Sequence, residues 1–147
     1  MEKGDRLMAY WLFKSEPSTW GWDNQLAKGD VGEEWDGVRN YQARNYMRVM
    51  QIGDRGLFYH SQKEKAVVGI VEVCALAHPD STTDDERWEC VDIRAVRSFD
   101  VPVTLEQIKA DERLREMVLV KNSRLSVQPV SDTEWGVVCA MGQTTPD

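Results

Sequence analysis

The sequence lacks the long apolar runs, glycine-rich phosphate loops and linkers that would assign it to several large protein classes. No apolar run in its 147 residues approaches the roughly 20 residues of a membrane-spanning helix, so we expect a soluble protein with no membrane partner. Neither an internal repeat nor a Pro- or Gly-rich linker divides the chain. One domain is therefore favoured, of a size that can bury its own core without metals or disulfides.

Cysteine and histidine are too few and too scattered to indicate a metal centre or a disulfide framework. Cys74, Cys90 and Cys139 form no C-x-x-C pair, and each lies in an apolar context typical of a small buried side chain. The two histidines, His60 and His78, belong to no H-E-x-x-H motif. We therefore expect no metal, no cofactor and no disulfides.

Positive charge is in deficit, because 18 basic residues face 25 acidic ones and the formal net charge is −7. This balance argues against an extended electrostatic groove along nucleic acid, where neutralised phosphates supply most of the affinity. The charges are nevertheless segregated, with bases gathered at 39–48, 63–65 and 121–124 and acids at 33–36, 80–89 and 132–134. A local basic face is compatible with this pattern.

The ends of the chain differ in pattern from its middle. Residues 1–6 lack the apolar core of a secretory signal, which favours a cytoplasmic or nuclear location. We expect residues 1–9 to be a short disordered lead-in, residues 10–142 a single domain and residues 143–147 a tail.

Strand and helix patterns are interspersed along the domain, which predicts an α+β fold. Runs or alternations of β-branched and aromatic residues predict strands over 10–14, 55–61, 66–77, 88–99 and 124–130. Helical spacing and capping residues predict helices over about 24–28, 41–51, 104–117 and 131–141. The second and third strands resemble a hairpin in which Gly69 marks a bulge or a close approach, and Pro129 places the last strand near an edge.

The stretch from Trp35 to Arg48 combines aromatic rings, amides and three arginines. Trp35 lies outside any apolar periodicity, so both stacking on a ligand and burial fit it. Arg39 and Asn40 precede the helix, where free N–H groups favour an anion or the polar edge of a ligand. Further along, Ala43, Tyr46, Met47 and Met50 form the stripe expected to pack on the core, while Arg44 and Arg48 fall on other faces as solvated charges or outer phosphate contacts.

Two further polar groups invite a functional interpretation. A hydrolase-like pair of His60 and Ser61 is disfavoured, because strand neighbours point to opposite faces and no G-x-S-x-G elbow is present. Arg124 and Ser126 share a strand face and, with Gln128, form either a set of ligand donors or a set of satisfied structural groups.

Five segments taken together closely resemble the EVE domain family, in the family's order and over nearly the whole chain from Tyr10 to Met141: 11–17, 35–45, 58–61, 77–80 and 124–130. The resemblance implies a PUA-like curved, mixed β-barrel with flanking helices, related to the YTH and ASCH domains. It also implies a non-catalytic pocket for an extruded base, which reads a modified cytosine in DNA or a modified base in RNA.

The resemblance carries a set of ligand-binding residues onto this chain: Lys14, Ser15, Trp35, Arg39, Asn40, His60, Ser61, Arg124 and Ser126. In this interpretation the base stacks on Trp35, its Watson–Crick edge meets Asn40 and Ser61, and the basic side chains hold flanking phosphates. The acidity of the chain implies that binding to nucleic acid is weak or assisted by a partner.

Two other functions are compatible with the sequence. The first is an enzyme that acts on a modified nucleotide or another small planar substrate, with His60 or Lys14 as acid or base. The second is a protein-interaction module whose acidic surface, including residues 84–86, docks a basic partner.

Overall fold

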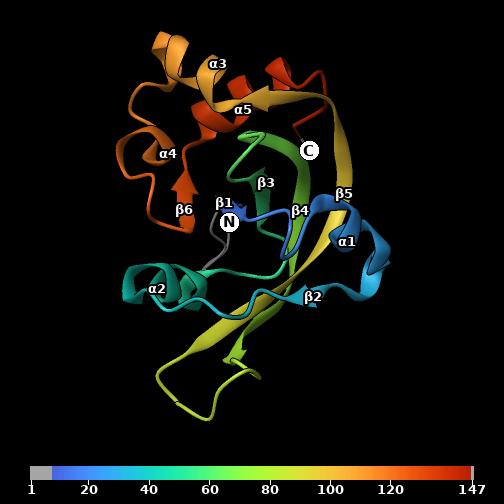
Figure 1. Ribbon diagram of the computed structural model, residues 1–147, viewed down its shortest axis with the longest axis vertical. Coiled ribbons are helices and arrows are strands. Elements are labelled where there is room, and N and C mark those ends of the chain that lie inside the picture. The colour runs from blue at the N-terminus through green and yellow to red at the C-terminus, as the bar shows by residue number, and fades with distance from the viewer. Residues whose placement is uncertain (1–7, 147) are drawn as a thin grey trace, which may run out of the picture.

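A single mixed sheet organises the protein in the computed structural model, which describes residues 8–146 (Figure 1). Its six strands are ordered β2-β5-β4-β3-β1-β6. Their bounds are β1 Tyr10–Ser15, β2 Glu33–Glu34, β3 Arg55–His60, β4 Ala66–Pro79, β5 Glu89–Thr104 and β6 Val127–Val130. β1 runs parallel to β3, and the other neighbouring pairs are antiparallel.

The predicted α+β class is confirmed, but the expected barrel closure is not formed. Within residues 8–146, β2 and β6 stand at opposite ends of the strand order, so the sheet stays open. The edge position predicted for the strand that contains Pro129 is confirmed, since β6 pairs only with β1 in this order. β2 was missed because it has only two residues, both glutamates, and carries no strand pattern.

The helices are α1 Trp22–Ala27, α2 Tyr41–Val49, α3 Leu105–Ala110, α4 Val118–Lys121 and α5 Asp132–Met141, with 3-10 turns at Gly29–Val31 and Glu112–Leu114. Three of the helices, α2, α3 and α5, begin at residues whose side chains cap them. Asn40 caps α2 by accepting the Ala43 N–H at 2.9 Å, and capping boxes open α3 and α5. The C-terminal helices gather at one end of the sheet, the upper end of Figure 1, while α2 lies toward the other.

The helix predicted over 104–117 is interrupted at Asp111. The backbone of Asp111 is extended, with φ −97° and ψ 118°, and its carboxylate accepts the Arg113 N–H to start the 3-10 turn. The side chain thus competes with the continuing helix for backbone donors. Leu114 and Met117 are nevertheless fully buried, as their positions in the pattern predicted.

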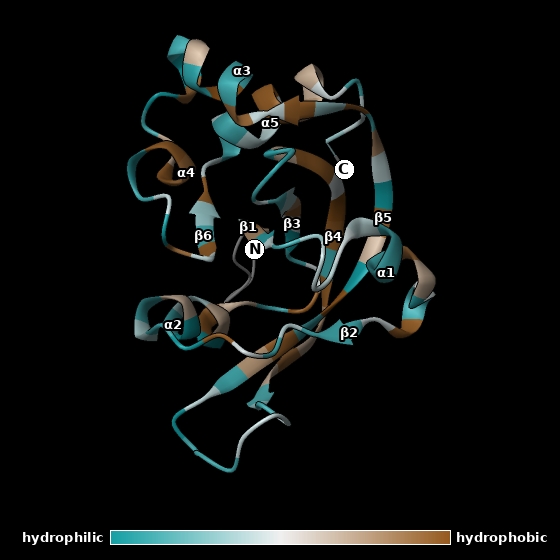
Figure 2. Ribbon diagram, in the orientation of Figure 1, coloured by the Kyte–Doolittle hydropathy of each residue, from teal (hydrophilic) through white to brown (hydrophobic). Residues whose placement is uncertain are grey.

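The sheet separates two hydrophobic cores, and β1 contributes to both by strict alternation. Trp11 and Phe13 lie in one core with Ala43, Met47 and Met50, and we call it the α2 core. The other, which we call the α5 core, lies on the opposite side of β1 and receives Leu12 together with side chains from α5: Trp135, Val138 and Cys139. Figure 2 shows hydrophobic residues concentrated along the central strands, whereas the loop between β4 and β5 is mostly hydrophilic. Trp11, Trp88 and Trp135 occupy positions where the hydrophobic periodicity predicts core residues, and this prediction is confirmed, as all three are buried.

The described ends of the chain pack against the domain. The Trp135 indole N–H donates to the carbonyl of Pro146 at 2.7 Å, and Arg97 donates to the carbonyl of Thr145 at 2.9 Å. Residues 143–146 therefore contact the folded part, whereas residues 1–7 of the expected lead-in lie outside the described residues. Between residues 8 and 146, none of the helices has both the length and the apolar character needed to cross a bilayer.

Gly69 on β4 is a point of close approach, as predicted. A Cβ atom at this position would lie 2.3 Å from Cζ2 of Trp22, and the β3–β4 register shifts beside it. Only a residue without a side chain lets the indole cover the strand here.

We expect Gly69→Ala to lower the free energy of unfolding by about 1–3 kcal/mol, because the added methyl group must displace a buried ring. The matched control is Gly136→Ala in α5, where a Cβ would meet nothing within 4 Å and helix propensity favours alanine. Urea unfolding of both variants checks this. Equal stability of Gly69→Ala and the parent would show that Trp22 does not hold its position.

Candidate functional site

A pocket of about 430 Å³ opens beside the C-terminal end of β1. Its lining comes from three parts of the chain, namely residues within 14–20, the turn 33–39 and Ser126 just before β6. The volume falls in the range of small-ligand sites. The pocket forms because β1 ends here and the turn after β2 crosses in front of it.

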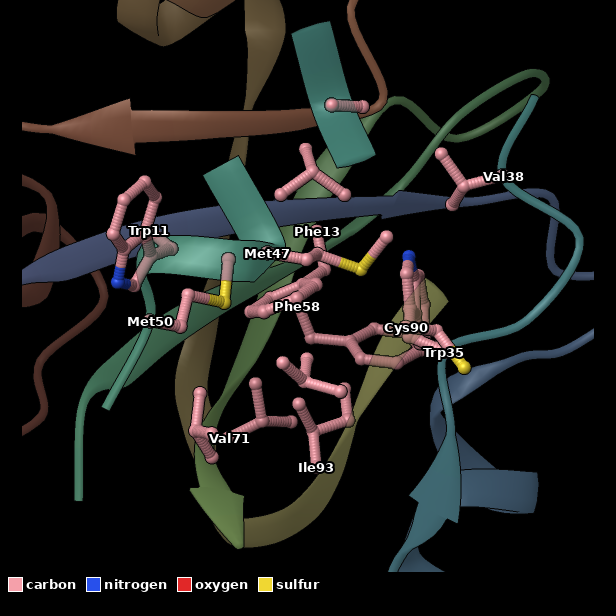
Figure 3. Close-up of a cluster of buried hydrophobic side chains, with 14 of the residues drawn as sticks. Trp11, Phe13, Trp35, Val38, Met47, Met50, Phe58, Val71, Cys90 and Ile93 are labelled. Atoms are coloured by element: carbon pink, nitrogen blue, oxygen red, sulfur yellow. The ribbon is translucent and has the colours of Figure 1, made fainter. Parts of the chain in front are cut away.

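The aromatic wall of the pocket is held by the α2 core. Trp35 is 8% exposed, and its ring meets Phe13 and Phe58 edge to face, with centroids 5.4 and 5.7 Å away. Figure 3 shows Trp35 at one end of this cluster, beside Cys90. Trp35 is thus a core residue that also lines the pocket, so its burial is confirmed and its stacking on a ligand stays a prediction.

Trp20 supplies a second and more accessible indole. It is half-buried, lines the pocket, and donates its indole N–H to Oε1 of Gln25 at 3.0 Å. The Gln25 side chain is itself fully buried and donates to the carbonyl of Ile93. The pocket therefore has two indole rings whose orientations are set by contacts outside it.

A buried carboxylate, Asp80, anchors the turn that forms the outer wall. Its Oδ2 atom accepts the Gly37 N–H at 2.9 Å and Nη1 of Arg39 at 3.2 Å, while Oδ1 accepts the Thr82 N–H at 2.8 Å. Gly37 has φ +78°, which a glycine adopts without strain. Burial raises the pKa of Asp80, but the hydrogen bonds from Thr82, Gly37 and Arg39 outweigh it and hold the pKa at about 2.

The opposite wall is built from the end of β1. Ser15 donates its hydroxyl to the carbonyl of Trp20 at 2.5 Å, and its own carbonyl accepts the N–H of Ser61 at 2.8 Å. Lys14 donates to the carbonyl of Ser123, and burial, with help from the neighbouring charge of Lys65, lowers the pKa of Lys14. Polar groups at this wall are thus largely engaged with backbone atoms.

Carboxylates give the pocket an acidic lining. Glu34 accepts both the hydroxyl of Ser81 at 2.6 Å and its N–H at 3.2 Å, which lower the pKa of Glu34. The carboxylate of Asp36 has no hydrogen-bond donor among residues 8–146, and desolvation together with the neighbouring acids raises its pKa. Such a lining suits a ligand that presents hydrogen-bond donors.

A cationic and aromatic surface adjoins the pocket at Arg39. Tyr41 stacks on Trp88 with ring centroids 4.9 Å apart, and Arg39 lies over Trp88 at 5.4 Å. Arg44 lies 4.8 Å from the Tyr41 centroid and donates to neutral acceptors, Oδ1 of Asn45 and the carbonyl of Arg87. Arg39 is paired with Asp80, so within the described chain Arg44 is the less neutralised of the two charges.

The structure brings five of the nine sequence-predicted site residues to the pocket: Lys14, Ser15, Trp35, Arg39 and Ser126. The others, Asn40, His60, Ser61 and Arg124, do not line it. Asn40 is the α2 cap, and Ser61 bonds to the backbone of Ser15. Their proposed ligand contacts stay predictions.

His60 has a structural partner that limits an acid–base role. Its Nε2 atom accepts the backbone N–H of Trp22 at 3.0 Å, and burial lowers its pKa. A ring nitrogen that accepts a hydrogen bond from a backbone N–H is not available as a base until that hydrogen bond breaks. No bond between His60 and Ser61 is formed in the described structure, as the alternation of the strand predicted.

Eight of the lining residues were not among the sequence-predicted site residues, and three of them carry chemistry that matters here: Trp20, Glu34 and Asp36. The acidic run 33–36 was interpreted as surface charge, although Asp36 directly follows Trp35 and shares its turn. An aromatic ring next to a carboxylate in a turn was the sequence feature that could have indicated Asp36 as a pocket residue. Trp20 lies near the start of the first predicted helix, where both packing and ligand contact fit the sequence, so the sequence leaves its role open.

Comparisons with known proteins agree with one another. The family model described as the EVE domain matches residues 9–141. Thymocyte nuclear protein 1 of Mus musculus is 34% identical over 97% of this chain and 77% of its own length. A crystal structure from Agrobacterium tumefaciens is 60% identical with a TM-score of 0.91, covering 92% of this chain and 94% of that one.

Two further solved structures are described with nucleic acid. Human THYN1 protein in complex with 5-methylcytosine-containing DNA is 31% identical, with a TM-score of 0.85, and covers 94% of this chain and 99% of that one. A YTH domain of Zygosaccharomyces rouxii in complex with N6-methyladenosine RNA is 15% identical, with a TM-score of 0.57, over 97% of this chain and 91% of that one. The second likeness shows a shared fold alone.

We expect Asp80→Asn to lower the free energy of unfolding by about 2 kcal/mol at neutral pH, since the carboxylate's pKa falls from 3.8 to about 2 on folding. Because the folded pKa is the lower one, the parent has this stability above about pH 4 and loses it as the pH falls toward 2. Urea unfolding between pH 2 and pH 7 checks the prediction. A gap between parent and variant that stays constant down to pH 2 would contradict it.

Proposed function

Because the chain belongs to the EVE domain family, we propose that it binds nucleic acid and reads a modified base, without catalysing a reaction. The observation that carries the proposal is the likeness to a human family member solved with 5-methylcytosine-containing DNA. We propose residues 10–142 as the single domain, and a PUA-like fold whose sheet is open. The likeness to a YTH domain supports that fold, and the cytoplasmic or nuclear location stays a prediction.

The pocket suits an extruded base of the cytosine type. Extruding a base from its stack costs a few kcal/mol of free energy. Stacking of the extruded base on an aromatic ring offsets about 1–3 kcal/mol of that cost. Trp35 and Trp20 offer such rings, and both are held by contacts outside the pocket. The carboxylate of Asp36 is free to accept the exocyclic amino group of a cytosine, the usual partner of Asp and Glu in base recognition.

The strand that delivers the base would run over the surface formed by Arg39, Tyr41, Arg44 and Trp88. Arginines at this surface meet phosphates, and the exposed ring of Tyr41 meets a neighbouring base. Since ion pairs such as Arg39 with Asp80 and Arg48 with Glu89 neutralise part of this charge, few phosphates are held. Weak or partner-assisted binding follows, in keeping with the net charge of −7.

We expect Asp36→Ala to weaken binding of a single-stranded DNA with one 5-methylcytosine by about 10-fold, because the base loses its amino-group acceptor. Fluorescence anisotropy measures the affinity, and the same strand with thymine, which lacks the amino group, should bind parent and variant equally. Asp100→Ala on β5 is the matched control, an exposed acid outside the pocket. Trp35 is unsuitable for this test, because its removal would leave a cavity in the α2 core.

Three outcomes of this test separate the alternatives. Equal loss with Asp36→Ala and Asp100→Ala would show that the effect does not arise in the pocket and would overturn the pocket assignment. Tighter binding of an RNA strand with N6-methyladenosine than of the DNA strand would move the base class from cytosine to adenine. Conversion of the strand into a product would contradict the non-catalytic part of the proposal.

We expect Arg44→Ala to weaken binding of all single strands alike, by about 3- to 10-fold, and to reduce the slope of log affinity against log salt by about one. Binding of a single 5-methylcytosine nucleoside should not change, because Arg44 does not line the pocket. Arg115→Ala, an exposed arginine between the 3-10 turn and α4, is the control. An unchanged salt slope would remove Arg44 from the strand path.

A further inference from the structure

Three neighbouring strands bring together side chains that could hold a metal ion, although the sequence has no metal-binding motif. His78 on β4 pairs in register with Cys90 on β5, and Glu34 on β2 pairs with Asp92 on β5. One donor atom from each of Glu34, His78 and Cys90 lies within 4.8 Å of the other two. Cross-strand pairing holds these donors close without any spacing signal along the chain.

A proton lies between two of these donors, in a place that a cation could take. The thiol of Cys90 donates to Oε1 of Glu34 with sulfur and oxygen 3.4 Å apart. In a tetrahedral zinc site, bonds of about 2.3 Å to sulfur and about 2.0 Å to oxygen put the two ligands roughly 3.5 Å apart. A zinc ion in place of the thiol proton would therefore need little movement of either side chain.

His78 has the second-shell partners of a metal-binding histidine. Nε2 lies 2.7 Å from Oδ1 of Asp92, and Nδ1 lies 3.1 Å from the carbonyl oxygen of Pro79. Whichever nitrogen binds a metal, the other keeps an acceptor that orients the ring, as is usual for histidine ligands. Burial lowers the pKa of His78, but the hydrogen bond to Asp92 outweighs this and raises it.

The charge of the three side chains and their access to solvent both favour a zinc ion. A thiolate and a carboxylate balance a divalent cation, and with a thiolate among N and O donors zinc is preferred over magnesium or calcium. Cys90 is fully buried, whereas the His78 side chain is 34% exposed, so the cluster is open to solvent on one side only. Burial and the Glu34 carboxylate raise the pKa of the Cys90 thiol, so binding must release that proton.

We propose that Glu34, His78 and Cys90 bind one zinc ion, with solvent in the fourth position and Asp92 as the carboxylate partner of the histidine. The ion would join β2, β4 and β5 next to the pocket, because Glu34 lines the pocket as well. This inference is independent of the proposed function and departs from the expectation of no metal site, which rested on spacing along the chain alone.

The test is a cobalt titration of the full chain, freed of any affinity tag and stripped of metal with a chelator. We expect one equivalent of cobalt to give a thiolate-to-cobalt charge-transfer band, which one equivalent of zinc then removes. Cys90→Ser and His78→Gln should each lose the band or weaken binding by about 100-fold or more. Asp92→Asn should weaken it by about 10- to 100-fold.

Cys139→Ser is the matched control, because this thiol is also fully buried but lies in the α5 core. It should keep the band and the affinity of the parent. Circular dichroism and thermal unfolding of each variant separate loss of binding from loss of fold, and His78→Gln, at a partly exposed side chain, is the variant least prone to unfold. A parent without the band, or a folded Cys90→Ser or His78→Gln variant with parental affinity, would overturn the proposal.

Discussion

The alternation of β1 between two cores is the constraint on which the rest of the structure depends. Trp11 and Phe13 face one way and Leu12 the other, and both faces are buried because a separate hydrophobic core packs on each side of β1. A slip of one residue would exchange these faces, so burial on both sides specifies the register strongly. The register in turn places Lys14 and Ser15 where the pocket opens. The site is therefore a direct product of how the core is filled.

Polar contacts rather than apolar ones then shape the pocket's outer wall. The turn 36–39 buries Val38 in the α2 core, and its backbone is held by Asp80, a carboxylate from the end of the long β4–β5 hairpin. A carboxylate that receives donors from both the turn and its own loop joins two segments far apart in sequence. Trp35 and Asp36 are neighbours in the chain but are held by different interactions. Apolar packing in the α2 core fixes the indole of Trp35, whereas hydrogen bonds to Asp80 hold the turn that carries the accessible carboxylate of Asp36.

Local chemistry explains what could be predicted from the sequence. Runs and alternations of strand-forming residues predicted β1, β3, β4, β5 and β6, helical spacing predicted α2, capping boxes predicted the starts of α3 and α5, and the close approach at Gly69 was anticipated. Pairing between distant segments explains what could not. β2 is too short to carry a sequence pattern. The open order of the sheet depends on which strands pair with one another. Trp20 and Asp36 reach the pocket only because distant segments of the chain pair in this way. Asn40 looked like a ligand group, yet its amide serves the helix start, since capping and recognition use the same side-chain chemistry.

A sheet that separates two cores also divides the ways in which this chain can evolve. Side chains of the α5 core, such as Val138 and Cys139, share no contact cluster with the rings that support the pocket. Substitutions on opposite sides should combine additively, because distant sites without shared partners rarely couple. Substitutions could thus accumulate in the C-terminal helices while the side of the sheet that carries the pocket stays under selection. Conversely, the pocket side could change to bind a new ligand while the C-terminal helices stay the same.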